Sequence, residues 1–100
     1  MRERDIRKAL KSRVEDYGGE IRAVSWLGRR HAPDVMVLFP GETRVGWVMP
    51  KGHPFVETKA PGGVPTDGQS REHARMWAAG CTVLVISTVE QLDKWLPPLP

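Results

Sequence analysis

FVETKA, residues 55–60, joins an apolar start to an acidic residue and a lysine two positions apart. Side chains alternate along a β-strand, so Glu57 and Lys59 project from one face if this segment is extended. A second apolar segment, VMVLF at 35–39, directly follows Pro33-Asp34. The two segments predict strands that can be neighbours in one sheet, with the carboxylates of Asp34 and Glu57 within reach of a common point.

Apolar periodicity predicts helices on either side of this strand region. Residues 3–17 carry an apolar stripe at helical spacing that ends at two glycines. Further helices are predicted at about 67–79 and 89–96, and strands at 20–26, 34–39, 43–49, 55–60 and 81–86. The order of helix, run of strands, helix, strand and helix predicts one α/β domain over residues 1–100. Trp77 and Trp95 fall on the apolar sides of their helices and are expected in the core.

Composition points away from membranes and mildly toward an anionic partner. Lys and Arg total 15 against 12 Asp and Glu, a net charge of +3, and no apolar run approaches the roughly 20 residues that span a bilayer. The charged N-terminus is unlike a signal peptide. We therefore expect an intracellular, cytoplasmic protein. The basic residues cluster in the first helix, at 29–31, and at Arg71 and Arg75.

Two carboxylates and an amine can support phosphodiester hydrolysis. Carboxylate oxygens bind hard cations such as Mg²⁺, with Mn²⁺ as a possible substitute, and a cation bound there can activate water. An acid and a lysine two apart on a strand are common by themselves, and Asp34 makes the pattern more specific. Glu3 heads the apolar stripe of the first helix, where a carboxylate is unexpected; the alternative is that it complements the helix dipole.

Several of these motifs together resemble a known family. GRRHAPD at 28–34, FVETKAPGG at 55–63, and Gln69 followed by His73 are similar to the virus-type replication-repair nuclease (VRR-NUC) domain of the PD-(D/E)xK nuclease superfamily. The resemblance runs from Glu3 to about Ser87. It implies a restriction-endonuclease-like core, a mixed sheet flanked by helices in the order α-β-β-β-α-β-α.

The resemblance also implies roles for individual residues. The implied catalytic set is Asp34, Glu57, Lys59, Glu3 and Gln69. Asp34 and Glu57 would bind the metal, Thr58 would add its backbone carbonyl, and Lys59 would position water or stabilise the transition state. The alternative for Gln69 is a polar residue that starts the second helix. His73 is expected to support the site or to pack, not to be a ligand.

The implied substrate is DNA, contacted at its phosphates by basic side chains: Lys8, Lys11, Arg29, Arg30, His31 and Arg71. Short members of the family resemble Holliday-junction resolvases and act as homodimers on branched DNA. The alternatives are a nuclease for flap, nicked or single-stranded DNA, and a non-catalytic DNA-binding protein with the same fold. The segment 47–54 is an extra length of chain that can extend a hairpin, touch DNA or build a dimer interface.

Overall fold

A computed structural model describes residues 1–39 and 53–100 of the chain. Its elements, in chain order, are α1 (Glu3–Asp16), β1 (Glu20–Ala23), β2 (Val35–Leu38), β3 (Phe55–Thr58), α2 (Asp67–Ala78), β4 (Val83–Ile86) and α3 (Val89–Trp95). The order α-β-β-β-α-β-α confirms the predicted fold. The strand predicted at 43–49 and most of the extra segment 47–54 lie outside the described residues.

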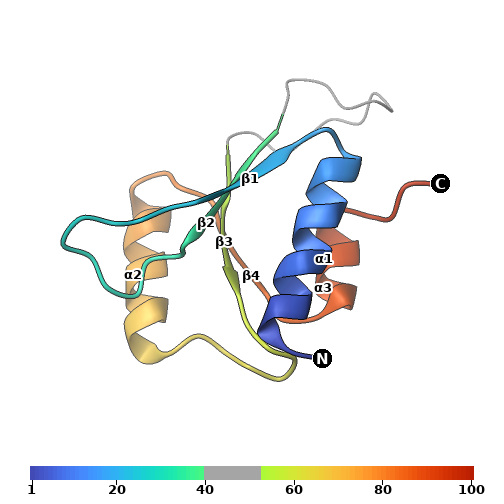
Figure 1. Ribbon diagram of the computed structural model, residues 1–100. Helices are drawn as coiled ribbons and strands as arrows, with labels where there is room; N and C mark the ends of the chain where they lie inside the picture. Colours follow the sequence, from blue (N-terminus) through green and yellow to red (C-terminus); the bar gives the residue numbers. More distant parts are fainter. Residues whose placement is uncertain (40–52) are drawn as a thin grey trace.

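The strands form one mixed sheet in the order β1-β2-β3-β4. β1 pairs with β2 and β2 with β3 in antiparallel fashion, whereas β3 and β4 are parallel. A parallel pair needs a crossover connection, and α2 supplies it between β3 and β4. In Figure 1 the sheet is seen nearly edge-on, with α1 and α3 together on one face and α2 on the other.

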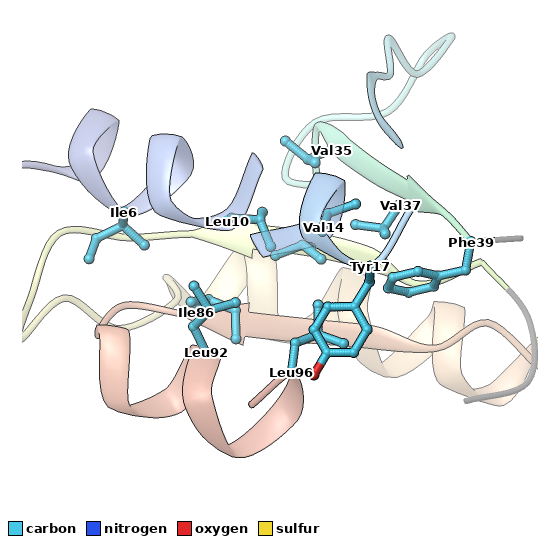
Figure 2. Close-up of a cluster of buried hydrophobic side chains, with 11 residues drawn as sticks. Ile6, Leu10, Val14, Tyr17, Val35, Val37, Phe39, Ile86, Leu92 and Leu96 are labelled. Atoms are coloured by element: carbon cyan, nitrogen blue, oxygen red, sulfur yellow. The ribbon is translucent and has the colours of Figure 1, made fainter. Parts of the chain in front are cut away.

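The hydrophobic core lies between the sheet and the α1–α3 pair. Figure 2 shows the inward side chains of these elements meeting there, and all of them are buried: Ile6, Leu10, Val14, Tyr17, Val35, Val37, Val56, Phe39, Ile86, Leu92 and Leu96. Phe39 meets the ring of Trp95 edge-on at 5.9 Å between centroids. The stripe predicted from helical spacing in α1 is therefore the core side of that helix. Among the described residues, no helix combines the length and apolar character that crossing a bilayer requires.

The α2 face of the sheet is more polar, and one prediction made for it is wrong. The residues that α2 buries are Glu72, His73 and Met76, two of which are ionisable. Trp77 follows directly and is 53% exposed, because one more helical step turns its side chain away from the sheet. Trp95 lies against the core as expected. The core position predicted for Trp77 is wrong because α2 packs over charged groups.

The turn between α1 and β1 crosses close to the end of β2 at Gly19, which gives a stability prediction. A Cβ at Gly19 would lie 2.8 Å from the Leu38 carbonyl oxygen and 2.9 Å from Cγ1 of Val14. We expect Gly19→Ala to lower the free energy of unfolding by about 1–3 kcal/mol, the usual cost of overpacking. Urea denaturation measures it, with Ser12→Ala on the exposed side of α1 as the control. Equal stability of the two variants would contradict the tight crossing.

Candidate active site

The register of β2 and β3 brings the two predicted carboxylates together. Val35 pairs with Val56 and Met36 with Phe55, and the Val37 amide donates to the Pro54 carbonyl in the same antiparallel register. One further step places Asp34 opposite Glu57. The carbonyl of Asp34 accepts a 2.8 Å hydrogen bond from the Val24 amide, which ties the start of β2 to the chain beyond β1. Residues 23 apart in sequence thus meet at one end of the sheet.

Glu57 is a buried carboxylate without a hydrogen bond on one oxygen. Its side chain is 10% exposed, and in the described part of the chain Oε1 has no hydrogen-bond partner. Nε2 of His73 lies 3.6 Å from this oxygen, a distance too long for a hydrogen bond. That nitrogen also has no hydrogen-bond partner in the described part of the chain. Burying a charge without partners is costly, so this oxygen is poised to accept a ligand.

The surroundings of Glu57 shift its ionisation and that of His73. Burial raises the pKa of Glu57; the Lys59 charge opposes this, while Asp34 and Glu3 add to it and Arg7 opposes it. Burial likewise lowers the pKa of His73, against the attraction of Glu72. Both shifts favour neutral forms, as expected where side chains leave water. The electrostatic influence of Asp34, Glu3 and Lys59 on Glu57 also shows that these charges gather around it.

Arg7 on α1 is a site residue that the sequence analysis did not single out. Its guanidinium donates to both carboxylate oxygens of Asp34 at 3.2 and 3.3 Å. It also donates to Oγ1 of Thr58, at 3.4 Å from Nε, and that hydroxyl donates to Oε1 of Glu3 at 3.2 Å. The spacing of four residues between Glu3 and Arg7, which puts both on one helix face, was the available signal. A cation of the protein itself therefore lies among the site's carboxylates.

The site is assembled around the end of β3 from both faces of the sheet. Glu57 lies against His73 of α2, whereas the neighbouring Thr58 contacts Glu3 and Arg7 of α1. This follows from strand alternation, which sends successive side chains to opposite faces. The acidic residue at the head of α1 thus reaches the site at the rim of the core, where its side chain is 48% exposed.

Removing Arg7 should destabilise the metal-free protein. In Arg7→Met the carboxylates of Asp34 and Glu3 lose their shared positive neighbour, and we expect a loss of about 1 kcal/mol at neutral pH and low salt. Denaturant titration in a chelating buffer measures it, and the loss should shrink as salt screens the charges. Arg22→Met is the matched control, because its pair with Glu20 is half exposed and isolated on β1. If Arg7→Met loses no more unfolding free energy than Arg22→Met does, Arg7 does not offset the negative charges of Asp34 and Glu3.

Gln69 lies where the sequence predicted, at the start of α2, and its side chain caps the helix. The side-chain Oε1 of Gln69 accepts a hydrogen bond from the Thr66 backbone amide at 2.9 Å, and the Gln69 backbone amide donates to Thr66 Oγ1 at 3.1 Å. This reciprocal pair is a capping box. The structure therefore shows the helix-start role that the sequence left open. Any support that Gln69 lends the site acts through the placement of α2, which presents His73 one turn later.

The donor set at this end of the sheet fits a hard divalent cation. Within residues 1–39 and 53–100, no three His, Cys, Asp or Glu side chains converge into a ready metal cage. Magnesium, however, is often held by one or two carboxylates and keeps several waters. The unpartnered Oε1 of Glu57, opposite Asp34, matches that mode of binding.

Cavities lined by basic side chains adjoin the site in the described part of the chain, and two of them contain the residues predicted to contact phosphate. One, of about 550 Å³, lies along α1 and is lined by Arg4, Asp5, Arg7, Lys8, Lys11 and Ile21. The other, here called the arginine pocket, has about 230 Å³ and is lined by Gly28, Arg29, Arg30, His31, Gly68, Arg71, Glu72 and Arg75. All six residues predicted to contact phosphate line one cavity or the other. The first cavity shares Arg7 with the site, and Glu72 of the second directly precedes His73.

Comparisons with known proteins agree with this geometry. No family model matches the chain. The chain is 39% identical over 97 residues to p44 of Acyrthosiphon pisum secondary endosymbiont phage 1, a protein named as a candidate nuclease; the match covers 97% of this chain and 94% of p44. A solved VRR_NUC domain is 34% identical and superposes with a TM-score of 0.71, covering 92% of this chain and 90% of that structure. The chain therefore belongs to the VRR-NUC domain family.

Proposed function

We propose that the protein is a metal-dependent endonuclease that hydrolyses phosphodiester bonds in DNA. The observation that carries this proposal is the buried oxygen of Glu57, which has no hydrogen-bond partner among the described residues, lies opposite Asp34 in the strand register and is near the charge of Lys59. Membership of the VRR-NUC family and the likeness to the phage protein p44 support nuclease chemistry. A protein that only binds DNA gains nothing from carboxylates that face its phosphates.

Each side chain has a part in the proposed mechanism. Asp34 and Glu57 would hold magnesium, with manganese as a possible substitute, and the carbonyl of Thr58 would be a further ligand. The bound metal would lower the pKa of a water and neutralise charge on the phosphate. The ammonium of Lys59 orients the attacking water and stabilises negative charge that develops on phosphorus. Arg7 and Glu3 set the charge around Asp34.

The raised pKa of Glu57 couples its ionisation to cation binding. The ionised side chain is unfavourable while it is buried without a positive ligand. With a cation held there, the ionised carboxylate of Glu57 would become the favoured form, because metal ligands bind deprotonated. The protein should accordingly bind magnesium more weakly as the pH falls toward the range in which Glu57 keeps its proton.

The proposed substrate is branched DNA, and the proposed active form is a homodimer. A chain of 100 residues offers a small contact surface. A two-fold dimer would present two sites to a four-way junction, whose symmetry matches its own. Basic cavities on either side of the site provide contacts for the phosphates that flank the cut.

Cleavage of a matched set of substrates tests this proposal. Labelled four-way junction, flap, nicked duplex, single strand and linear duplex of one sequence are incubated with Mg²⁺, with Mn²⁺ or with EDTA, and light scattering gives the oligomeric state. We expect cleavage with either metal, none with EDTA, and the fastest rate on the junction. Faster cutting of another substrate would remove the resolvase assignment alone. Binding without cleavage under every metal condition would contradict the nuclease.

A further inference from the structure

The arginine pocket is built from two segments that a buried carboxylate joins. Glu72 on α2 has a side chain only 10% exposed. It pairs with Nε of Arg29 at 3.4 Å and with NH1 of Arg75 at 3.7 Å. One guanidinium comes from the β1–β2 connection and the other from α2 itself. Glu72 therefore holds the two walls together, and the pocket still carries four guanidiniums against one carboxylate.

The loop wall is seated on α2 at a glycine. His31 has a backbone φ of +67°, a left-handed conformation that is uncommon outside glycine but that histidine, asparagine and aspartate adopt more often than other residues. Its ring lies over Gly68, where an added Cβ would be 2.8–3.0 Å from three ring atoms. A side chain at residue 68 would require this ring to move aside. The pocket is thus a shaped feature of the fold and not a chance gathering of surface arginines.

We infer that the arginine pocket binds one non-scissile phosphate of the DNA strand, next to the phosphate that is cut. Guanidinium groups match phosphate oxygens in pairs, and this makes arginine the usual residue for such sites. The volume of about 230 Å³ is below the roughly 300–1,000 Å³ of pockets that take small organic ligands, so a phosphate suits it better than a nucleoside. The choice of DNA as the occupant rests on the proposed function.

The position of the pocket places that phosphate beside the cut. His31 is three residues before Asp34, and Glu72 is followed by His73, whose ring lies 3.6 Å from Glu57. The loop wall therefore leads to Asp34, and the α2 wall leads to His73, which lies beside Glu57. A strand whose scissile phosphate lies at those carboxylates would place a neighbouring phosphate in the pocket, and the pocket would set the position of the cut.

Neutralising one phosphate at a time tests this assignment. Junction DNA with a single uncharged methylphosphonate, moved along the strand, is titrated with the full-length protein in EDTA and followed by fluorescence anisotropy. For wild type, one linkage beside the cut should weaken binding about tenfold, the scale of one charge-assisted hydrogen-bonded contact. Arg71→Ala should weaken binding of unmodified DNA by a similar factor. In this variant the methylphosphonate at that linkage should have no further effect, whereas those at other linkages should weaken binding as they do for wild type. Arg22→Ala removes the same charge outside the pocket and should keep the sensitivity.

The outcomes separate the pocket from general electrostatics and from catalysis. If Arg71→Ala keeps the wild-type response at every linkage, or if wild type does not bind the DNA, the assignment is wrong. Linkage-specific coupling in a protein that never cleaves would keep the pocket and remove the nuclease. Cleavage without linkage-specific coupling would keep the nuclease assignment and remove the pocket assignment.

A charge-neutral variant provides a second measurement. Gly68→Ala places a methyl group where the His31 ring lies, so the ring must move out of its place in the pocket lining, although alanine favours the helix more than glycine does. We expect severalfold weaker binding of the junction, lost sensitivity at the same linkage, and a thermal midpoint no lower than that of wild type. Unchanged binding by this folded variant would contradict the pocket's shape as the source of affinity.

Discussion

Glu57→Gln is expected to abolish DNA cleavage and at the same time to stabilise the metal-free protein. The amide has nearly the shape of the carboxylate but cannot supply the negative oxygen that a hard cation requires. We expect the cleavage rate to fall by about 10²-fold or more, in line with the loss of a group that stabilises transition-state charge. Without metal, the same change removes a buried charge whose Oε1 lacks a hydrogen bond.

The stability gain has a defined pH dependence. Because the folded-state pKa of Glu57 is raised above its ordinary value of 4.5, the folded protein holds this proton more tightly than the unfolded chain does. The benefit of the proton is fully present below pH 4.5 and is lost as the pH rises through the folded-state pKa. Glu57→Gln should therefore gain about 1 kcal/mol at pH 7 and little at pH 4.

Thermal and urea unfolding in EDTA at the two pH values measure this effect, with single-turnover cleavage measured alongside. Glu15→Gln on the exposed side of α1 is the control and should leave both quantities nearly unchanged. The amide that Glu57→Gln introduces is also placed to donate to Nε2 of His73, which lacks a partner among the described residues. A Glu57→Gln protein that is less stable at pH 7, or that cleaves like wild type, would contradict this account of the site.

Lys59→Ala is the second variant with a large expected effect. Lys59 follows β3, projects from the face of Glu57, and is half-buried. Loss of its ammonium should reduce the rate of the chemical step by about 10²–10³-fold, as removal of a preorganised charge-stabilising donor does. Binding of DNA in EDTA should weaken far less than the rate falls, by no more than the roughly tenfold of one charge-assisted contact. A Lys59→Ala protein that cuts as fast as wild type would make the catalytic assignment wrong.

A pH profile distinguishes this role from a structural one. Among the charges near Glu57, Lys59 has the largest effect in lowering its pKa. Its removal should raise that pKa further, so the rising limb of the residual rate against pH should move to higher pH. Single-turnover rates in Mg²⁺ over a pH series measure this shift. Lys94→Ala, an exposed change on α3, is the control and should keep the wild-type profile.

Much of the fold was predictable because local patterns record burial. The spacing of Ile6, Leu10 and Val14 predicted the core side of α1, and the structure buries all three completely or nearly so. Thr66 and Thr88 directly precede α2 and α3, and each accepts a backbone amide hydrogen bond at the helix start, as threonine commonly does. These features depend on a few consecutive residues, so a single sequence contains the information needed to predict them.

The site was predictable in part for the same reason. Strand alternation put Glu57 and Lys59 on one face, and the apolar run after Asp34 indicated the partner strand. The pairing of Asp34 with Glu57, by contrast, depends on the register of β2 and β3. A shift by one residue would reverse the faces of that strand.

From its sequence alone, this chain's element order, its main core face and the acid–lysine pattern could be derived. The position of Arg7 on Asp34, the approach of His73 to Glu57, the arginine pocket closed by Glu72, and the exposure of Trp77 became visible only in the folded structure. The spacing of apolar residues along a helix or strand indicates which side of that element is apolar. Contacts between charged side chains depend on how elements far apart in sequence are packed, and that packing sets their distances and their loss of water.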